Sequence, residues 1–393
     1  MNSKSGMKNI NTNRKHLLLV ALFLVVFLAP GSLYSTSMRE SPHGDKRKLP
    51  QGCASCHKGH GQYNTPMLPE SEDVFCFECH GHYKNVEQTR RQGRLSRDTK
   101  AADLQREFEK AYHHPIERTG IHKYGETLPE TDPSKPRHSE CADCHNHHYP
   151  TETNTLAGVK GITMSGAQVQ AVTQEYELCF KCHLTSANLP ADQIGQMEVF
   201  DLTNRSFHPV VGPGKNSAVP SLMSPLTATS TIKCTDCHNN DDPRGPRGPH
   251  GSNYRYILAK NYTETDGSEG SFQYELCYGC HRRSSILGNE SFQYHSVHVS
   301  FAGTSCKTCH DSHGSAHNAH LINFDQLSVL PSSSGRTEYI DLGRRAGQCY
   351  LTCHGKDHNP GVYPAAQSNS SQKQTPAAAP DLPAGFRNFQ RFR

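Results

Sequence analysis

The pattern of apolar and polar positions along the chain begins with one long apolar run. This run, Leu17 to Ala29, has thirteen residues and follows a stretch with four basic residues and no acidic one. Its length suits the apolar part of a signal peptide and is short for a membrane span. We therefore expect residues 1–37 to be an export signal, with cleavage near Ser35–Ser37 or Ala29–Gly31. An uncleaved anchor is the alternative, and we expect no transmembrane span after signal cleavage.

Regular periodicity is limited after this run. The best helical pattern lies at Thr99–His114, and two segments that read YELC, at 176–179 and 274–277, predict short helices that run into cysteine motifs. Alternating strand patterns are sparse, and Ala187–Ser230 shows little pattern of any kind. The sequence therefore predicts short α-helices, long irregular loops and little or no β-sheet.

Composition adds that an ordinary core would be poorly filled. Only 34% of the chain is apolar, tryptophan is absent, and there are 31 glycines and 24 prolines. Something other than side chains must fill the interior, or much of the chain is disordered. Without residues 1–37 the 41 basic residues fall by four to 37, which equals the 37 acidic ones. This balance removes the main support for nucleic acid as a partner.

Cysteine and histidine explain what fills the interior. The chain has 16 cysteines and 26 histidines. Seven times it reads C-x-x-C-H, and an eighth motif has three residues between its cysteines, so that every cysteine is used. The eight motifs are Cys53/Cys56/His57, Cys76/Cys79/His80, Cys141/Cys144/His145, Cys179/Cys182/His183, Cys234/Cys237/His238, Cys277/Cys280/His281, Cys306/Cys309/His310 and Cys349/Cys353/His354.

The spacing of these motifs suits covalently bound c-type haem. Two cysteines about one turn apart can form thioethers with the two vinyl groups of a haem, and the adjacent histidine then becomes the proximal ligand of the iron. Disulfides need no histidine after each second cysteine, and zinc sites would need two cysteine pairs brought together. We therefore predict eight covalently bound c-type haems. The eighth motif is included because it keeps both cysteines, the histidine and its place in the repeat described next.

The motifs form a four-fold repeat. Each copy has a leading histidine, a first motif, a further histidine that is often followed by glycine, and a second motif. This organisation predicts four dihaem modules at 38–100, 101–187, 188–285 and 286–360. Residues 361–393, rich in Pro, Ala, Ser and Gln, are expected to form a flexible tail.

The eight recurrent histidines outside the motifs are candidate distal ligands. His57 and His60 lie three residues apart and would project from one side of a helical turn, whereas axial ligands approach an iron from opposite faces. Each is therefore expected to serve a different haem. The candidates are His43, His60, His114, His148, His208, His250, His295 and His313, with His113, His147 and His298 as alternatives to His114, His148 and His295. The nine histidines expected to be solvated side chains are His82, His113, His122, His138, His147, His298, His317, His320 and His358.

This arrangement resembles the doubled C-x-x-C-H family of multihaem c-type cytochromes over nearly all of residues 40–360. The resemblance implies electron transfer by low-spin haems with two histidine ligands, held by little regular secondary structure. It also implies a periplasmic or outer-surface location and respiration on external acceptors, with some family members forming filaments. The expected fold is a multihaem cytochrome c, with four tandem dihaem modules around a stacked haem chain.

Three functions remain open at this stage. An electron carrier would have two histidines on every iron and no catalytic residue. A multihaem oxidoreductase acting on a nitrogen or sulfur oxyanion would need one iron with an open position. A filament subunit, which is a homo-polymer, would be a carrier that assembles.

The sequence also suggests partners and potentials. We expect redox partner proteins such as other cytochromes, with an outer-membrane conduit among the candidates. Haem propionates would make the exported chain acidic, so its docking surfaces are expected to favour basic partners. Methionine ligands raise haem potentials, and only seven methionines are present, so the potentials are predicted to be low.

Overall fold

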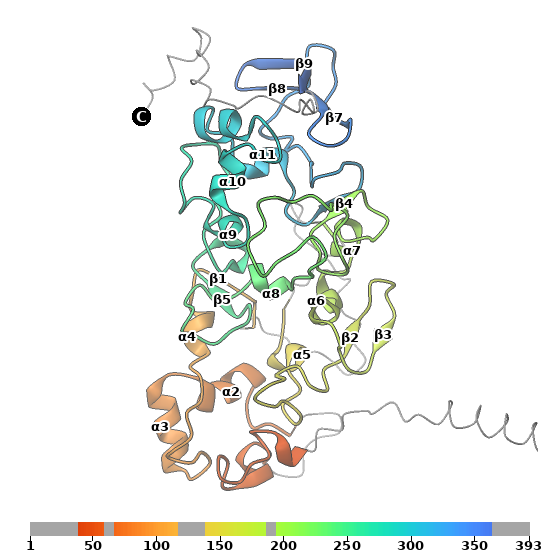
Figure 1. The fold of residues 1–393 in the computed structure, drawn as a ribbon. Coiled ribbons are helices and arrows are strands. Elements are labelled where there is room, and N and C mark those ends of the chain that lie inside the picture. Colours follow the sequence, from red (N-terminus) through yellow and green to blue (C-terminus); the bar gives the residue numbers. More distant parts are fainter. Residues whose placement is uncertain (1–37, 59–66, 117–137, 186–193, 364–393) are drawn as a thin grey trace, which may run out of the picture. The chain divides into compact units, whose positions relative to one another are not determined.

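The computed structural model describes residues 38–58, 67–116, 138–185 and 194–363 (Figure 1). The chain divides into two compact units. Among the described residues, unit 1 contains those up to Cys182 together with Pro243–Gly251, and unit 2 contains His183–Asp242 and the residues from Ser252 onward. The predicted signal at 1–37 lies outside the described residues.

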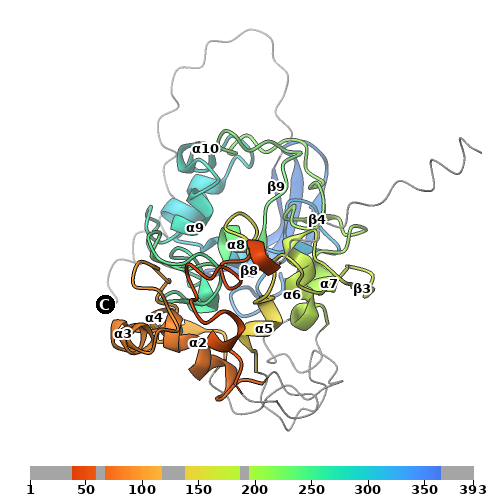
Figure 2. The same ribbon diagram turned by 90° about the horizontal axis from the view of Figure 1, so that it is seen from below.

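Loops make up most of the described chain, with short helices between them (Figure 2). This agrees with the predicted fold of irregular loops and short α-helices. Three helices have nine residues each, namely α2 (Glu72–His80), α3 (Tyr83–Arg91) and α6 (Glu175–His183). Within the described ranges, no helix has both the length and the apolar character that a membrane span requires.

Unit 1 has a small apolar core built against a motif cysteine. Helices α2 and α3 pack against each other (Figure 1), and Leu49, Val86 and Leu95 form a buried cluster on which Cys79 packs. The remaining elements of this unit are η1 (Met38–Glu40), η2 (Gly52–Ser55), α4 (Gln105–Phe108), β1 (Tyr112–His113), α5 (Cys141–Cys144), β2 (Gly161–Ile162), β3 (Gln168–Val169) and most of α6.

A buried arginine holds α2 against the first motif of the chain. Arg94 is only 5% exposed. Its Nε donates to the carbonyl of Ser55 at 2.9 Å, its guanidinium forms an ion pair with Glu78, and it lies 5.1 Å from the ring centroid of Phe75. A buried charge needs such a partner set to be tolerated. The second motif, which belongs to α2, is thereby fixed beside the first.

The predicted helix at Thr99–His114 is mostly wrong. Only Gln105–Phe108 is helical, as α4. Tyr112 and His113 form β1, which pairs with β5 (Gly251–Ser252). The conformation of this segment is therefore set by a turn and by pairing with another strand. Such a tertiary contact cannot be inferred from the local spacing of apolar residues.

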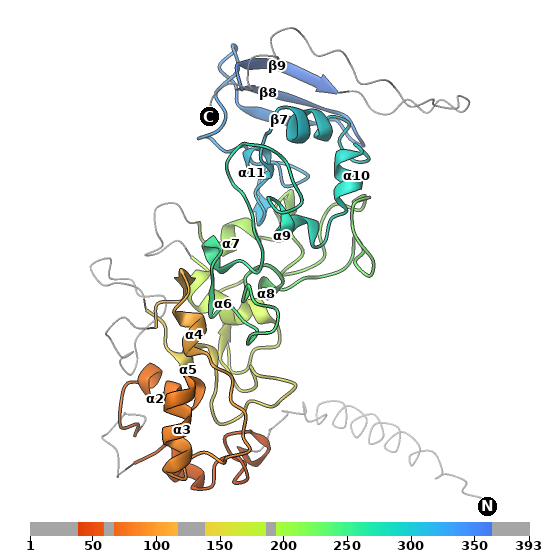
Figure 3. The same ribbon diagram turned by 90° about the vertical axis from the view of Figure 1, so that its left-hand side faces the viewer.

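Unit 2 ends in a three-stranded antiparallel sheet, in the order β7-β8-β9, which Figure 3 shows side by side. Phe324, Val329, Tyr339, Leu351 and Tyr363 form the core beneath it, and Cys309, Cys349 and Cys353 pack on that core. The elements of this unit are α7 (Gln196–Val199), β4 (Ser206–Phe207), α8 (Cys234–Cys237), η3 (Arg255–Ile257), α9 (Glu275–Tyr278), α10 (Arg283–Leu287), the π-helical η4 (Ser296–Phe301), α11 (Cys306–Cys309), β6 (Gly314–Ser315), β7 (Glu338–Asp341), β8 (Gly347–Cys353) and β9 (Lys356–Tyr363).

This sheet was not predicted. The inward positions of β8 are Cys349, Leu351 and Cys353, so two of its three core residues carry the signal of a haem motif rather than that of a strand. Strand β9 contains Pro360 and Gly361, which usually argue against a strand. It also runs to Tyr363, three residues into the predicted tail, and the rest of that tail lies outside the described residues.

Candidate haem sites

The seven C-x-x-C-H motifs share one local structure, a single helical turn. In five of them the backbone N–H of the histidine donates to the carbonyl of the first cysteine. These bonds are His57 to Cys53, His145 to Cys141, His238 to Cys234, His281 to Cys277 and His310 to Cys306, at 2.8 to 2.9 Å. The other two motifs lie inside α2 and α6. A turn places both sulfurs and the imidazole on one short segment, as attachment to one haem requires.

Polar residues inside or directly before three of the motifs stabilise these turns. Asp143 of α5 accepts the backbone N–H of Glu140 at 2.7 Å, and Asp236 of α8 accepts that of Lys233 at 2.7 Å. In α11, Ser305 accepts the N–H of Thr308. Each bond satisfies a backbone donor at the start of a turn that is too short to satisfy its own.

The motif histidines face histidines from elsewhere in the chain. A metal–imidazole bond is about 2 Å long and the ligating nitrogen lies about 1 Å from the ring centre, so two imidazoles on opposite sides of one metal have centroids about 6 Å apart. Six pairs meet this condition, with centroids 6.0 to 6.5 Å apart. They are His57–His148, His80–His43 and His145–His250 in unit 1, and His238–His313, His281–His208 and His310–His295 in unit 2.

In three of these pairs the two histidines belong to different modules. His57 faces His148, His145 faces His250, and His238 faces His313. In each pair, the histidine of a module's first motif faces the histidine that follows the first motif of the next module. Two histidines three residues apart on a turn thus serve different pairs, the arrangement that the sequence predicts.

A repeated hydrogen bond orients the leading histidine of the first three modules. The Nδ1–H of His43 donates to the carbonyl of His147 at 2.9 Å, that of His114 donates to Pro249 at 2.7 Å, and that of His208 donates to Ser312. Each acceptor directly precedes the distal candidate of the following module. Anchoring Nδ1 fixes the ring and leaves Nε2 as the nitrogen that can bind iron.

Glycines allow the backbone after several of these histidines to lie in contact with the backbone of another segment. A side chain at Gly314 would collide with the carbonyl of Val199, and one at Gly251 would collide with that of Glu107. Gly44, which follows His43, meets the carbonyl of Met38 in the same way. The recurrent His-Gly therefore has a steric cause, since only glycine permits this backbone contact.

Burial favours the neutral form of four of the facing imidazoles. Desolvation is the largest cause that lowers the pKa of His250, His281 and His313 to about 4 and that of His295 to about 3. Neutral imidazole is the form that binds a metal. At pH 7 these rings are therefore ready to act as ligands.

Cysteines of consecutive motifs lie close together within each unit. The Cys76 thiol is hydrogen-bonded to Cys141, which is the main cause that raises its pKa, and Cys306 has the same relationship with Cys277. Burial raises the pKa of Cys144 to about 12, and the nearby Cys182 contributes. These thiols stand where haem thioethers would be, so the residues fit a chain of neighbouring haems.

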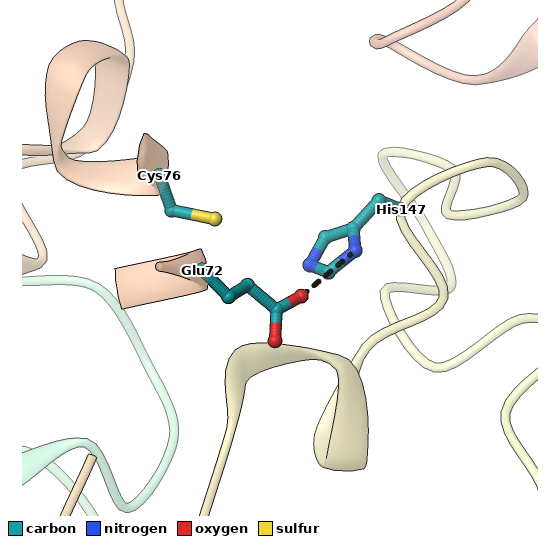
Figure 4. A group of neighbouring side chains, drawn as sticks. All are labelled: Glu72, Cys76 and His147. Carbon is teal, nitrogen blue, oxygen red and sulfur yellow. Dashed lines mark ion pairs between the residues drawn. The ribbon is translucent and has the colours of Figure 1, made fainter. Parts of the chain in front are cut away.

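A carboxylate and a histidine flank one of these cysteines (Figure 4). Glu72 and Cys76 lie one turn apart on α2, and an oxygen of Glu72 is 3.5 Å from Nδ1 of His147. Glu72 also accepts the backbone N–H of Ala142 at 3.1 Å. The three side chains could hold a metal by distance, but Cys76 belongs to a haem motif. Burial raises the pKa of Glu72 to about 7 and lowers that of His147 to about 4.

The remaining candidates are placed differently. His60 lies outside the described residues. The roles of His183 as a proximal ligand and of His114 as a distal ligand stay predictions. His354, the predicted proximal histidine of the eighth motif, has its Nε2 2.7 Å from a carboxylate oxygen of Asp266. His298 and His358, both expected to be solvated, face each other with centroids 6.2 Å apart. No sequence signal pointed to His358, and only its proximity to His295 pointed to His298.

Comparison with known proteins supports the assignment of the motifs. Residues 47–85 and 225–285 match the family described as the doubled CXXCH motif. The multiheme cytochrome MtrA of Shewanella baltica (strain OS185) is 23% identical over 252 residues, which cover 57% of this chain and 59% of that protein. The chain thus spans about three fifths of the length of this curated relative. No solved structure matches the chain.

Proposed function

We propose that this chain, a member of the doubled-CXXCH family of multihaem c-type cytochromes, binds eight covalent c-type haems and carries electrons along them. When bound, each haem supplies a reversible one-electron iron couple. The residues of the chain hold, orient and desolvate that couple.

The observation that carries the proposal is the recurrent pairing of histidine rings. In six pairs a motif histidine faces a second histidine at a separation that suits one iron. Two such imidazoles would hold the iron of a bound haem and would leave no place for a substrate on it. This favours a carrier over an oxyanion reductase, which needs an open position.

The placement of the cysteines supports transfer between sites. Contacts between consecutive motifs, such as Cys76 with Cys141 and Cys277 with Cys306, put the attachment points of neighbouring haems side by side. Histidine rather than methionine ligation favours low potentials.

Location and partners follow from the family and the relative. A protein related to a multiheme cytochrome is expected to exchange electrons with other cytochromes. The basic and apolar start of the sequence supports export to the periplasm or the cell surface. The proposal includes assembly into a homo-polymer, as some members of the family form filaments.

Two measurements on the purified ferric protein test the proposal. Intact mass is expected to show eight attached haems, and electron paramagnetic resonance is expected to show only low-spin iron. A stoichiometric high-spin signal in the unmodified protein would instead indicate the oxidoreductase. Electron microscopy separates a monomeric carrier from a filament.

A further inference from the structure

Two of the predicted proximal histidines are each hydrogen-bonded to the loop that follows their motif. The Nδ1–H of His238 donates to the carbonyl of Tyr256 at 2.8 Å, and that of His310 donates to the carbonyl of His320 at 3.0 Å. A carbonyl in this position fixes the orientation of the ring, leaves Nε2 as the nitrogen that can bind iron, and makes the imidazole a more electron-rich ligand. The placement of each carbonyl therefore bears on the potential of the haem proposed there.

Both carbonyls belong to turns with a left-handed backbone. Tyr256 and Ile257 have φ angles of 61° and 56°, and His320 and Leu321 have φ angles of 61° and 58°. Within the described residues, these are the two places where consecutive residues other than glycine are left-handed. Such residues are strained, and the conformation persists only where the surrounding structure holds it.

A buried serine supplies part of that support in each loop. The Oγ–H of Ser252 donates to the carbonyl of Leu258 at 2.6 Å, and that of Ser315 donates to the carbonyl of Ile322 at 2.8 Å. Leu258 and Ile322 directly follow the two left-handed turns. The serines are 0% and 5% exposed, so loss of either hydroxyl would remove a buried hydrogen bond next to the turn.

The serine and the turn occur together in the repeat. Each serine ends a His-Gly-Ser sequence, at 250–252 and 313–315, which begins with a distal candidate. In the second module the distal candidate His148 is followed by Tyr-Pro instead. There Nδ1 of His145 lies 3.3 Å from the carbonyl of Thr155, which is not left-handed. The hydrogen bond to the proximal histidine is therefore longer where the serine and the turn are missing.

We infer that the buried serine of each His-Gly-Ser sequence is a positioning residue that lowers the potential of one haem. Ser252 acts on the haem proposed at His238, and Ser315 acts on the haem proposed at His310. Each serine holds a strained turn, and the turn presents a carbonyl to the proximal histidine. The resulting electron density on the imidazole favours ferric iron. This inference rests on the proposed attachment of haem at these two motifs.

The first test compares Ser252→Ala and Ser315→Ala with Ser268→Ala, a control at an exposed position, in the full-length protein by spectroelectrochemical titration. Each buried variant is expected to raise one potential, and the two variants should affect different haems. Ser268→Ala should keep the wild-type potentials. A purely structural serine would lower the thermal midpoint of unfolding without shifting any potential, and that result would overturn the inference.

A second test changes the turn at an exposed side chain, so it stays informative if the serine variants fail to fold. His320 is exposed, and His320→Gly and His320→Val remove the same side chain while keeping the carbonyl. Glycine accepts a left-handed φ, whereas β-branched valine strongly disfavours it. The potential of the haem proposed at His310 is therefore expected to be higher in His320→Val than in His320→Gly. Equal potentials would contradict the positioning of the carbonyl by the turn.

Peptide mass spectrometry of the wild-type protein separates failure of this inference from failure of the proposed function. The peptides that contain His238 and His310 with their motif cysteines are each expected to carry one haem. Unmodified cysteines in these peptides would refute the proposed function at the two motifs. Attached haems with unchanged potentials in all the variants would refute only the role of the serines.

Discussion

The imidazole rings of His238 and His313 are parallel to within 3°, and their centroids lie 6.1 Å apart. The two residues come from different modules of the repeat. Both residues are partly buried, and desolvation lowers the pKa of each below the ordinary value for histidine. Two neutral imidazoles at this separation would suit a bis-histidine iron.

Replacing His313 with alanine should open one iron. The spectrum of the ferric protein is expected to gain one high-spin equivalent while the mass still shows eight haems, because the thioethers are untouched. His317→Ala is the matched control, since His317 is exposed in the same loop. A low-spin spectrum identical to wild type in His313→Ala would contradict the assignment of His313.

A buried serine is hydrogen-bonded to one of the predicted proximal histidines. The Oγ of Ser221 lies 2.9 Å from Nδ1 of His281, and Ser221 is only 6% exposed. Ser221→Ala removes this bond, so His281 donates less electron density and one haem potential should rise. Spectroelectrochemical titration would measure the shift, with Ser217→Ala, at an exposed position, as the control. Unchanged potentials in Ser221→Ala would show that the bond has no electronic role.

A side chain at Gly314, the residue after the distal candidate His313, should destabilise the protein. In Gly314→Ala the new methyl group collides with the carbonyl of Val199, and this backbone contact cannot yield without moving a strand. Overpacking of this kind costs about 1–3 kcal/mol, so the thermal midpoint should fall. Gly267→Ala is the control, because a side chain there meets open space and the residue has no left-handed φ. Equal midpoints for the two variants would contradict the steric argument.

Features that recur in the repeat could be predicted from the sequence, whereas the C-terminal sheet, which occurs once, could not. Helical turns at the motifs follow from spacing, as does the expectation that two histidines three residues apart serve different partners, because each depends on residues that recur. Which ring faces which could not be predicted. The C-terminal sheet does not recur. Its core positions in β8 are cysteines, and the face that joins His358 to Leu351 exists only after β8 and β9 pair. Nothing local distinguishes His358 from a solvated histidine.

The Thr99–His114 error has the same cause. The backbone of Leu104 donates to the carbonyl of His80 at 2.7 Å, and Tyr112–His113 pairs with β5, so tertiary contacts fix this segment against its helical spacing. Local propensity is a weak guide where another segment supplies the hydrogen bonds.

The potential of the haem attached at Cys76/Cys79 should depend on pH through Glu72. Burial raises the pKa of Glu72 from its ordinary value to about 7, so the carboxyl is protonated below pH 6 and ionised above pH 8. The negative charge formed as pH rises stabilises ferric iron, and the potential of this haem should fall across pH 6–8 by at most about 59 mV per pH unit, the limit for one proton coupled to one electron.

Glu72→Gln removes this titration and should flatten the pH dependence of that one potential. Glu70→Gln, at an exposed position before the same helix, is the matched control and should keep the wild-type slope. The same pKa shift affects stability. Because the folded protein holds this proton more tightly than the unfolded chain, the contribution of Glu72 to stability is present below about pH 4.5 and is lost as pH rises through 7. A wild-type slope in Glu72→Gln would exclude Glu72 as the group that couples proton uptake to reduction.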